Sequence, residues 1–242
     1  MGPTNPTSSF LLTRGVSVAA LTVGVLLVLA SGPRSAAAFF SLSAPTAIFQ
    51  LEQGKELEAR HLAQVEEDVR HALTYGVNRA ELNSHLSYIS LRRLLAEDRN
   101  TAARKEVAQA LESVEAALTR RPLDSYLWTR YTHLSYLLDG LSPYTLAALD
   151  RSFVYGSNEW QLFQFRIKLC LLEWEKLPPS LRRKTQKQIE FGEADTLVWG
   201  HILADLPHNA RERLLAFLAQ TSADIERAQR IENSLRRGRE AL

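Results

Sequence analysis

A long uncharged stretch near the N-terminus constrains this chain more than any other part of its sequence. Residues 15–31 read GVSVAALTVGVLLVLAS and contain no charged side chain. Extended back to Phe10, the apolar run is interrupted only by Arg14. A helix needs about 20 mostly apolar residues to cross the hydrocarbon core of a bilayer. Residues 10–31 are therefore predicted to form a transmembrane anchor, preceded by a short tail at residues 1–9.

Two other interpretations fit this stretch. A secretory signal peptide would be cut near Ala36, Ala37 and Ala38, where small residues resemble a cleavage site. However, the run is longer than the roughly 7–15 apolar residues of a signal peptide, and only Arg14 supplies the basic N-terminal region. A buried core helix is disfavoured because the run is apolar on all sides. We therefore expect an uncleaved anchor.

The charges that flank the run indicate an orientation. Arg14 and the α-amino group lie before it, whereas Arg34 is the only basic residue after it until Lys55. The positive-inside rule then favours a cytoplasmic N-terminus. In a bacterium, this single-pass orientation in the inner membrane would place the remainder of the chain in the periplasm. Residues 32–45, which are small and bounded by prolines, are expected to form a linker.

The remaining residues, 46–242, are expected to form one all-α domain. With 45% hydrophobic and 23% charged residues overall, the chain can bury a real core. An apolar stripe runs from Ile48 to Leu73, with Gly54 as a weak point. Later helices are expected to begin near Asn78, Thr101, Ser157, Ser180, Ala194, Pro207 and Ser222. The formal net charge of +2 is too even to indicate a nucleic-acid partner.

A spacing of 34 residues recurs in the middle of the chain. Breakers and apolar residues repeat at this interval, as in Pro122 and Gly156, Trp128 and Leu162, Tyr131 and Phe165, and Leu138 and Leu172. This period is the length of one helix-turn-helix repeat. The region around residues 110–172 is therefore predicted to contain stacked helix pairs.

The residues around Pro122 resemble the tetratricopeptide repeat. The resemblance rests on the order small, large, small, proline, tryptophan, carried by Ala110, Val114, Ala117, Pro122 and Trp128, with Tyr131 following. It covers about residues 78–175 and departs from the pattern at Thr132 and Ser135. What it implies is a domain of packed helix pairs closed by capping helices, in which these six residues hold neighbouring helices together.

No catalytic or metal-binding signature is present in the sequence. The chain has no phosphate-binding glycine loop, no nucleophile elbow and no HExxH motif. Its histidines are not spaced four residues apart, and its single cysteine, Cys170, lies in an apolar run that is typical of a core. We therefore expect a non-enzymatic protein without a cofactor or metal.

Two sets of residues are candidates for partner binding. Arg182, Arg183, Lys184 and Lys187 form a basic cluster that could attract an anionic polysaccharide or a lipid headgroup, although a solvated helix face explains it as well. Tyr136 and Tyr144 belong to an aromatic-rich region suited to a groove that grips a peptide or stacks on sugars, with core packing as the alternative.

A second resemblance concerns biological role. The strings RRPLDSYLW, LCLLEWEKL and QKQIEFG, within residues 103–192, resemble accessory proteins of bacterial exopolysaccharide biosynthesis of the VpsP-like type. The resemblance implies a membrane-tethered scaffold that binds other proteins of such an assembly, and it brings no catalytic residues. The alternative is an accessory structural subunit of another membrane complex, with a peripheral helical cap.

Overall fold

The computed structural model describes residues 6–53, 55–96, 104–191 and 196–221. In this part of the chain 84% of residues are helical and none form a strand, which confirms the all-α class. The chain divides into two compact units, residues 1–102 and 103–242, where we had expected one domain after the anchor. The cap predicted at Thr101 and the helix predicted from Ser222 lie outside the described residues.

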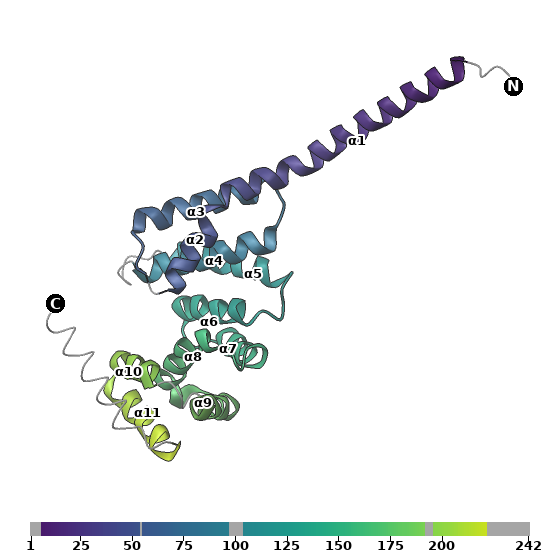
Figure 1. Ribbon diagram of the computed structural model, residues 1–242. Helices are drawn as coiled ribbons and strands as arrows, with labels where there is room; N and C mark the ends of the chain where they lie inside the picture. Colours follow the sequence, from purple (N-terminus) through teal and green to yellow (C-terminus); the bar gives the residue numbers. More distant parts are fainter. Residues whose placement is uncertain (1–5, 54, 97–103, 192–195, 222–242) are drawn as a thin grey trace. The chain divides into compact units, whose positions relative to one another are not determined.

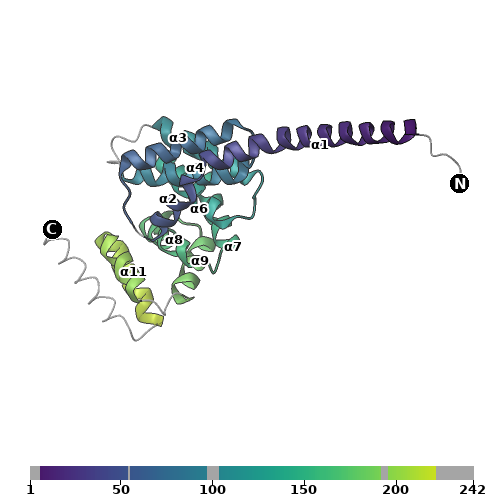
Figure 2. The same ribbon diagram turned by 45° about the horizontal axis from the view of Figure 1, so that its top comes forward.

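The described part of unit 1 contains four helices, α1 (Pro6–Phe40), α2 (Ser43–Glu52), α3 (Ala59–Thr74) and α4 (Arg79–Ala96). Figures 1 and 2 show α3 and α4 beside the C-terminal end of α1, whose N-terminal part extends well beyond them. The buried core combines one end of α1 with α2, α3 and α4 and contains Ala37, Ala44, Ala47, Leu51, Leu62, Val65, Val69, Ala72, Leu82, Leu86 and Ile89.

Helix α1 continues through the segment that we expected to be a linker. Residues 32–40 are helical, with Pro33 inside the helix, and α2 begins only three residues after Phe40. The three alanines before Phe39 are strong helix formers. In addition, the burial of Ala37 against the other helices stabilises this last part of α1. Residues 32–45 thus comprise the end of α1, a two-residue turn and the start of α2.

The apolar stripe from Ile48 to Leu73 is divided between α2 and α3, which are separated by residues 53–58. The break allows Leu51 and Leu62 to reach the same core from two helices. Beyond the end of α3, Gly76 has φ of 73°, a left-handed conformation that is common just after a helix and favours glycine.

Unit 2 continues with helical segments α5 (Arg104–Leu118), α6 (Ser125–Asp139), α7 (Pro143–Tyr155), α8 (Trp160–Leu172), the short 3-10 helix η1 (Trp174–Lys176), α9 (Pro179–Phe191), α10 (Thr196–Asp205) and α11 (His208–Thr221). Helix α6 packs against α5 and α7, and α8 packs against α9. Helix α6 also contacts α8, the helix two places further along the chain.

Local signals set the starts of α6 and α7. The Asp124 carboxylate accepts hydrogen bonds from the backbone N–H groups of Tyr126 and Leu127, at 2.9 and 3.1 Å. The Ser142 hydroxyl accepts one from Thr145 N at 3.2 Å, and Pro143 occupies the first turn of α7. Both arrangements satisfy backbone donors that have no partner within the helix.

Candidate partner-binding surfaces

The first candidate surface is the exposed part of α1. Its large apolar side chains are 50–70% exposed, and they comprise Leu21, Val23, Val25, Leu26, Leu27, Val28 and Leu29. Consecutive residues point to different sides of a helix, so the exposed apolar surface surrounds α1 instead of following one stripe. Within the described residues, this is the one helix long and apolar enough to cross a membrane.

The C-terminal end of α1 belongs to the core of unit 1. Ala37 is 1% exposed. The ring of Phe40 lies against His71 and Tyr75 of unit 1, with centroid separations of 4.1 and 5.9 Å. Phe39, by contrast, is 69% exposed. The two neighbouring phenylalanines therefore have different environments.

The residues assigned to repeat packing divide into a buried and a partly exposed group. Ala110, Val114 and Ala117 are buried on α5. Trp128 is half-buried on α6, and its indole N–H donates a 2.7 Å hydrogen bond to the carbonyl oxygen of Pro122. The tryptophan thereby fixes the turn between α5 and α6.

Tyr131 lies on the same side of α6 as Trp128, with the two rings 6.0 Å apart. Tyr131 is half-buried, and burial together with the neighbouring Glu115 carboxylate raises the pKa of its hydroxyl. The guanidinium of Arg151 on α7 covers the Trp128 ring at 4.4 Å. These contacts link α5, α6 and α7 at their edges, outside the buried core.

A row of side-chain contacts joins α6 to the region of α8. The Tyr126 hydroxyl lies 2.8 Å from both the Glu159 carboxylate and the amide oxygen of Gln161. His133 stacks on Phe165 at 4.3 Å. The row continues where the Tyr136 hydroxyl donates to the Glu173 carboxylate at 2.7 Å. We call the surface that carries this row, together with the exposed Leu137 and Leu172, the α6–α8 face.

Of the two tyrosines proposed for partner binding, only Tyr136 lies in this row. The hydrogen bond from Lys176 and the one from Tyr136 lower the pKa of the Glu173 carboxyl. Tyr144 lies on α7 and is 74% exposed. The aromatic residues predicted from the sequence to form one surface thus lie on more than one helix. The hydroxyl of Tyr136 is already bonded to Glu173, which directly follows α8.

The predicted basic cluster on α9 is divided by the fold. Lys184 forms an ion pair with Asp150 of α7 at 2.6 Å. Arg182 donates to the carbonyl oxygen of Glu175 at 2.8 Å, and its guanidinium lies 5.7 Å from the Trp174 ring centroid. The other two residues of the cluster remain exposed on α9.

Arg183 and Lys187 are four residues apart on α9, which places them on one side of the helix. Neither has an ion-pair partner among the described residues. The part of the cluster available to an anionic ligand therefore carries two positive charges instead of four.

A buried arginine was not anticipated from the sequence. Arg166 on α8 is fully buried, and its guanidinium donates to the Ser152 hydroxyl at 2.7 Å and to the carbonyl oxygens of Ser152 and Gly156. These acceptors are at the C-terminal end of α7, where a positive charge is favourable. Burial lowers the pKa of Arg166 to about 10, so the guanidinium stays charged at neutral pH.

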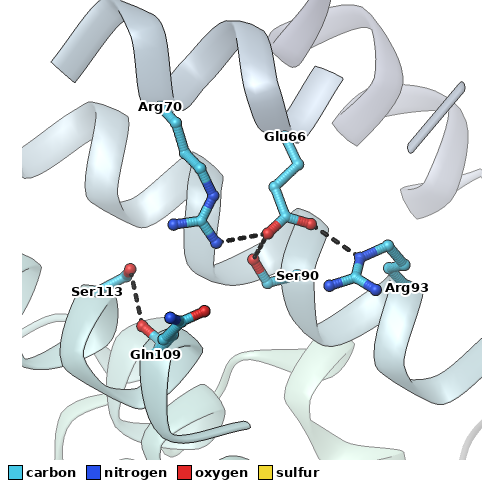
Figure 3. Close-up of polar contacts among 6 residues, drawn as sticks. All are labelled: Glu66, Arg70, Ser90, Arg93, Gln109 and Ser113. Atoms are coloured by element: carbon cyan, nitrogen blue, oxygen red, sulfur yellow. Dashed lines mark hydrogen bonds and ion pairs between the residues drawn. The ribbon is translucent and has the colours of Figure 1, made fainter. Parts of the chain in front are cut away.

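Unit 1 contains a buried carboxylate, shown in Figure 3. Glu66 on α3 accepts hydrogen bonds from Arg70 at 2.6 Å, Ser90 at 3.1 Å and Arg93 at 2.9 Å. Burial alone would raise its pKa, but the two guanidinium groups outweigh this and lower it. Figure 3 also shows a local bond within α5, from the Ser113 hydroxyl to the carbonyl oxygen of Gln109. The paired Glu66 is suited to holding α3 against α4.

The described residues contain no group of three metal-binding side chains. Cys170 is buried, and burial raises the pKa of its thiol to about 12. A thiol that stays protonated is a poor nucleophile.

The chain was also compared with protein-family models, with curated proteins and with solved structures, and none of these comparisons found a match. The surfaces described above are therefore the basis for a functional proposal.

Proposed function

We propose that this protein is a non-enzymatic, membrane-anchored adaptor whose unit 2 binds a partner protein. The observation that carries this proposal is the exposed apolar surface of α1 on a helix that continues into the core of unit 1. In water, so large an apolar surface is unfavourable, whereas a bilayer accommodates it. The proposed location is the bacterial inner membrane, with a single pass and with the folded units in the periplasm.

The junction between α1 and unit 1 favours a retained anchor over a cleaved signal peptide. Cleavage near Ala36, Ala37 and Ala38 would cut a continuous helix at a residue that is 1% exposed. It would also remove Ala37 from the core of unit 1. An uncleaved α1 preserves both the anchor and the packing of Ala37 in the core of unit 1.

The α6–α8 face is the surface that we propose for the partner protein. It carries aromatic rings and hydrogen-bonding groups beside two exposed leucines, Leu137 and Leu172. This combination is typical of protein interfaces, in which an apolar centre is surrounded by polar groups. The exposed pair Arg183 and Lys187 on α9 offers a separate, weaker attraction for an anionic polysaccharide or lipid headgroup. No nucleic-acid partner is proposed.

The proposed setting is an assembly that synthesises or exports envelope polysaccharide. The proteins that contact this chain would best identify that assembly. This setting rests on the short strings that resemble accessory proteins of exopolysaccharide biosynthesis. A scaffold in such an assembly needs an anchor and a binding surface, and it needs no catalytic group. The accessory-subunit alternative shares the anchor, but it requires α1 itself to pack against other membrane helices.

The anchor is tested by expressing the full chain with a C-terminal tag in bacteria. We expect the tagged protein to remain in the membrane after extraction with alkaline carbonate and to retain the mass of the uncut chain. A soluble product that begins near Phe39 would show that the N-terminal segment is a signal peptide and would overturn the anchor.

Partner binding is tested by chemical cross-linking in membranes, followed by purification through the tag. Leu137→Glu combined with Leu172→Glu should abolish a specific cross-linked product, because the added charges would have to be desolvated in the interface. Leu123→Glu is the matched control, since Leu123 is 67% exposed and precedes α6 instead of lying on its face with α8. An equal yield from all three proteins would exclude the α6–α8 face.

A further inference from the structure

The positions of two arginines on α1 define where a bilayer would end. Arg14 and Arg34 both lie in α1, and no charged residue lies between them. Their separation of 20 residues corresponds to about 30 Å at 1.5 Å per residue, which is the thickness of the hydrocarbon core. Once α1 spans a membrane, as proposed above, Arg34 marks the edge of the hydrocarbon on the side of unit 1.

The core of unit 1 begins immediately after this edge. Ala37 follows Arg34 by three helical residues and Phe40 by six, or about 5 and 9 Å along the axis. The headgroup layer on each side of a bilayer is about 5–8 Å thick. Ala37 is already buried by the other helices of unit 1. Because α1 is continuous here, no flexible linker separates this packing from the membrane surface.

Helix α3 runs back toward the bilayer. Phe40 contacts Tyr75 and His71, whereas Ser43, three residues later, is hydrogen-bonded to Asp68 at 3.3 Å. The contacts therefore move toward the start of α3 as the chain leaves the membrane, so the two directions are antiparallel. In Figure 1 the turn between α3 and α4 correspondingly lies on the side of the extended part of α1.

The residues of this turn have the chemistry of a headgroup contact. Thr74, Gly76, Asn78 and Arg79 are exposed, and Tyr75 is half-buried beside Phe40. Tyrosine is enriched where membrane meets water, and the guanidinium of arginine pairs well with phosphate.

The charges near the turn leave a small positive excess. Arg34 and Arg79 contribute two positive charges and Glu81 one negative charge. The guanidinium of Arg34 also donates to the carbonyl oxygen of Ala30 at 3.2 Å, one turn back along α1. Its remaining N–H groups are suited to a phosphate at the same level.

From this geometry we propose that the turn between α3 and α4, residues 74–79, rests on the phospholipid headgroups of the membrane that α1 spans. The occupant of this surface is the phosphate layer of the bilayer, contacted by Arg34, Arg79 and Tyr75. The proposal rests on the proposed anchor and adds a second, peripheral membrane contact to it. Unit 1 is thereby held at the membrane surface by two contacts, α1 and this turn.

The test uses nitroxide spin labels on the full chain in vesicles of phosphatidylcholine and phosphatidylglycerol. One label is placed at Thr74→Cys and the control at His61→Cys, both exposed positions on α3. The two are 13 residues apart, or about 20 Å along the helix. The buried Cys170, with its protonated thiol, does not compete for the label.

We expect the label at position 74 to collide more often with oxygen, which concentrates in lipid, and less often with an aqueous nickel chelate. The ratio of the two collision rates should be several-fold higher than at position 61. A ten-residue Gly-Ser insertion between Arg34 and Ser35 should bring position 74 to the ratio of the control, since unit 1 would then be free to leave the surface.

The outcomes separate this proposal from the anchor itself. Equal ratios at positions 74 and 61 in a protein that resists carbonate extraction would overturn the headgroup contact and leave the anchor in place. Release of the unmodified chain by carbonate would overturn both. A high ratio at position 74 that survives the insertion would also support the headgroup contact, and it would show that the residues of the turn maintain this contact without the rigid junction.

Discussion

Arg166 is buried against the end of α7, and its hydrogen bonds all go to atoms of Ser152 and Gly156. The cost of burying its charge is offset by these bonds and by its position at the C-terminal end of the α7 dipole. A buried charge is thus used to fix α8 against α7, where an apolar side chain would satisfy none of these oxygens.

Replacement of Arg166 tests this role. Arg166→Met should lower the free energy of unfolding by about 2–3 kcal/mol, because hydrogen bonds from a charged group are lost in a buried site. Lys168→Met is the control on the same helix; Lys168 pairs with Asp205 near the surface, so its loss should cost less than about 1 kcal/mol. Urea unfolding followed by circular dichroism measures both, and equal effects would contradict the assigned role.

Glu66 predicts a dependence of stability on pH. Its pKa in the folded protein lies below 4.5, the ordinary value for a glutamate, because Arg70 and Arg93 are bonded to it, so its ionised form is stabilised by folding. This contribution is complete above the unfolded pKa and is lost as the pH falls from about 4.5 through the lowered folded pKa. The difference in unfolding free energy between the wild type and Glu66→Gln should therefore shrink below pH 4.5. A difference that is constant from pH 7 to pH 3 would contradict this.

Cys170 should be inert toward thiol reagents in the folded protein. Its thiol is buried, and its pKa of about 12 leaves almost no thiolate at neutral pH. We expect no modification by a maleimide at pH 7 in mild detergent, and complete modification in the presence of urea. Rapid labelling without denaturant would show that the core around α8 opens readily.

At the scale of helices, Gly156 allows the end of α7 to approach the start of α6. A Cβ atom added at Gly156 would meet the Cβ and Oγ of Ser125 well inside contact distance, although the φ of Gly156 lies outside the left-handed region. Glycine is therefore needed here for space.

Gly156→Ala should lower the free energy of unfolding by about 1–3 kcal/mol, which is typical of overpacking. Ser157→Ala, at the exposed neighbouring residue, is the control and should change stability by less than about 0.5 kcal/mol. Thermal unfolding of the two variants distinguishes a steric requirement at position 156 from a general sensitivity of this turn.

The helix starts predicted near Asn78, Ser180 and Pro207 lie within one residue of the starts of α4, α9 and α11, because the signals that begin a helix are local. The caps at Asp124 and Ser142 are equally local, although they were not singled out from the sequence. The linker at residues 32–45 was also predicted from local signals, namely small residues and bounding prolines. These signals do not include the contacts that the segment makes with distant helices. Residues 32–40 remain helical because Ala37 and Phe40 are covered by α3, which is distant in sequence.

The candidate sites were predicted less completely because they also depend on contacts between residues that are distant in the sequence. The 34-residue spacing paired Pro122 with Gly156 as residues that interrupt helices. The structure instead requires glycine at position 156 because Ser125 lies so close, and this contact exists only in the packed helices. The basic cluster on α9 was visible as a run of charges, but whether Lys184 stays free depends on Asp150 of α7. The tetratricopeptide-type packing remains a prediction.

At the scale of the whole molecule, each of the two units contains apolar clusters formed by its own described residues. The cluster around Val65 and Ile89 belongs entirely to unit 1, and the clusters around Ile167 and Leu149 belong entirely to unit 2. Each unit thus has at least one apolar core of its own, which is the usual requirement for independent folding.

We therefore expect residues 104–242 to fold when expressed alone. The fragment should show the circular dichroism of an α-helical protein and a single cooperative urea transition, because the clusters around Ile167 and Leu149 lie wholly within it. The wild-type chain in detergent should include a transition at the same midpoint. A fragment without a cooperative transition would show that the two units fold as one.

The absence of a linker after α1 has a mechanical consequence. A transmembrane helix adapts to a change in bilayer thickness by changing its tilt, commonly within 0–40° of the membrane normal. Since Ala37 and Phe40 join α1 firmly to α3, unit 1 must rotate with the helix through the same angle. In the proposed membrane-anchored protein, a change in bilayer thickness therefore changes the angle of unit 1 relative to the membrane surface by the same amount as the tilt of α1.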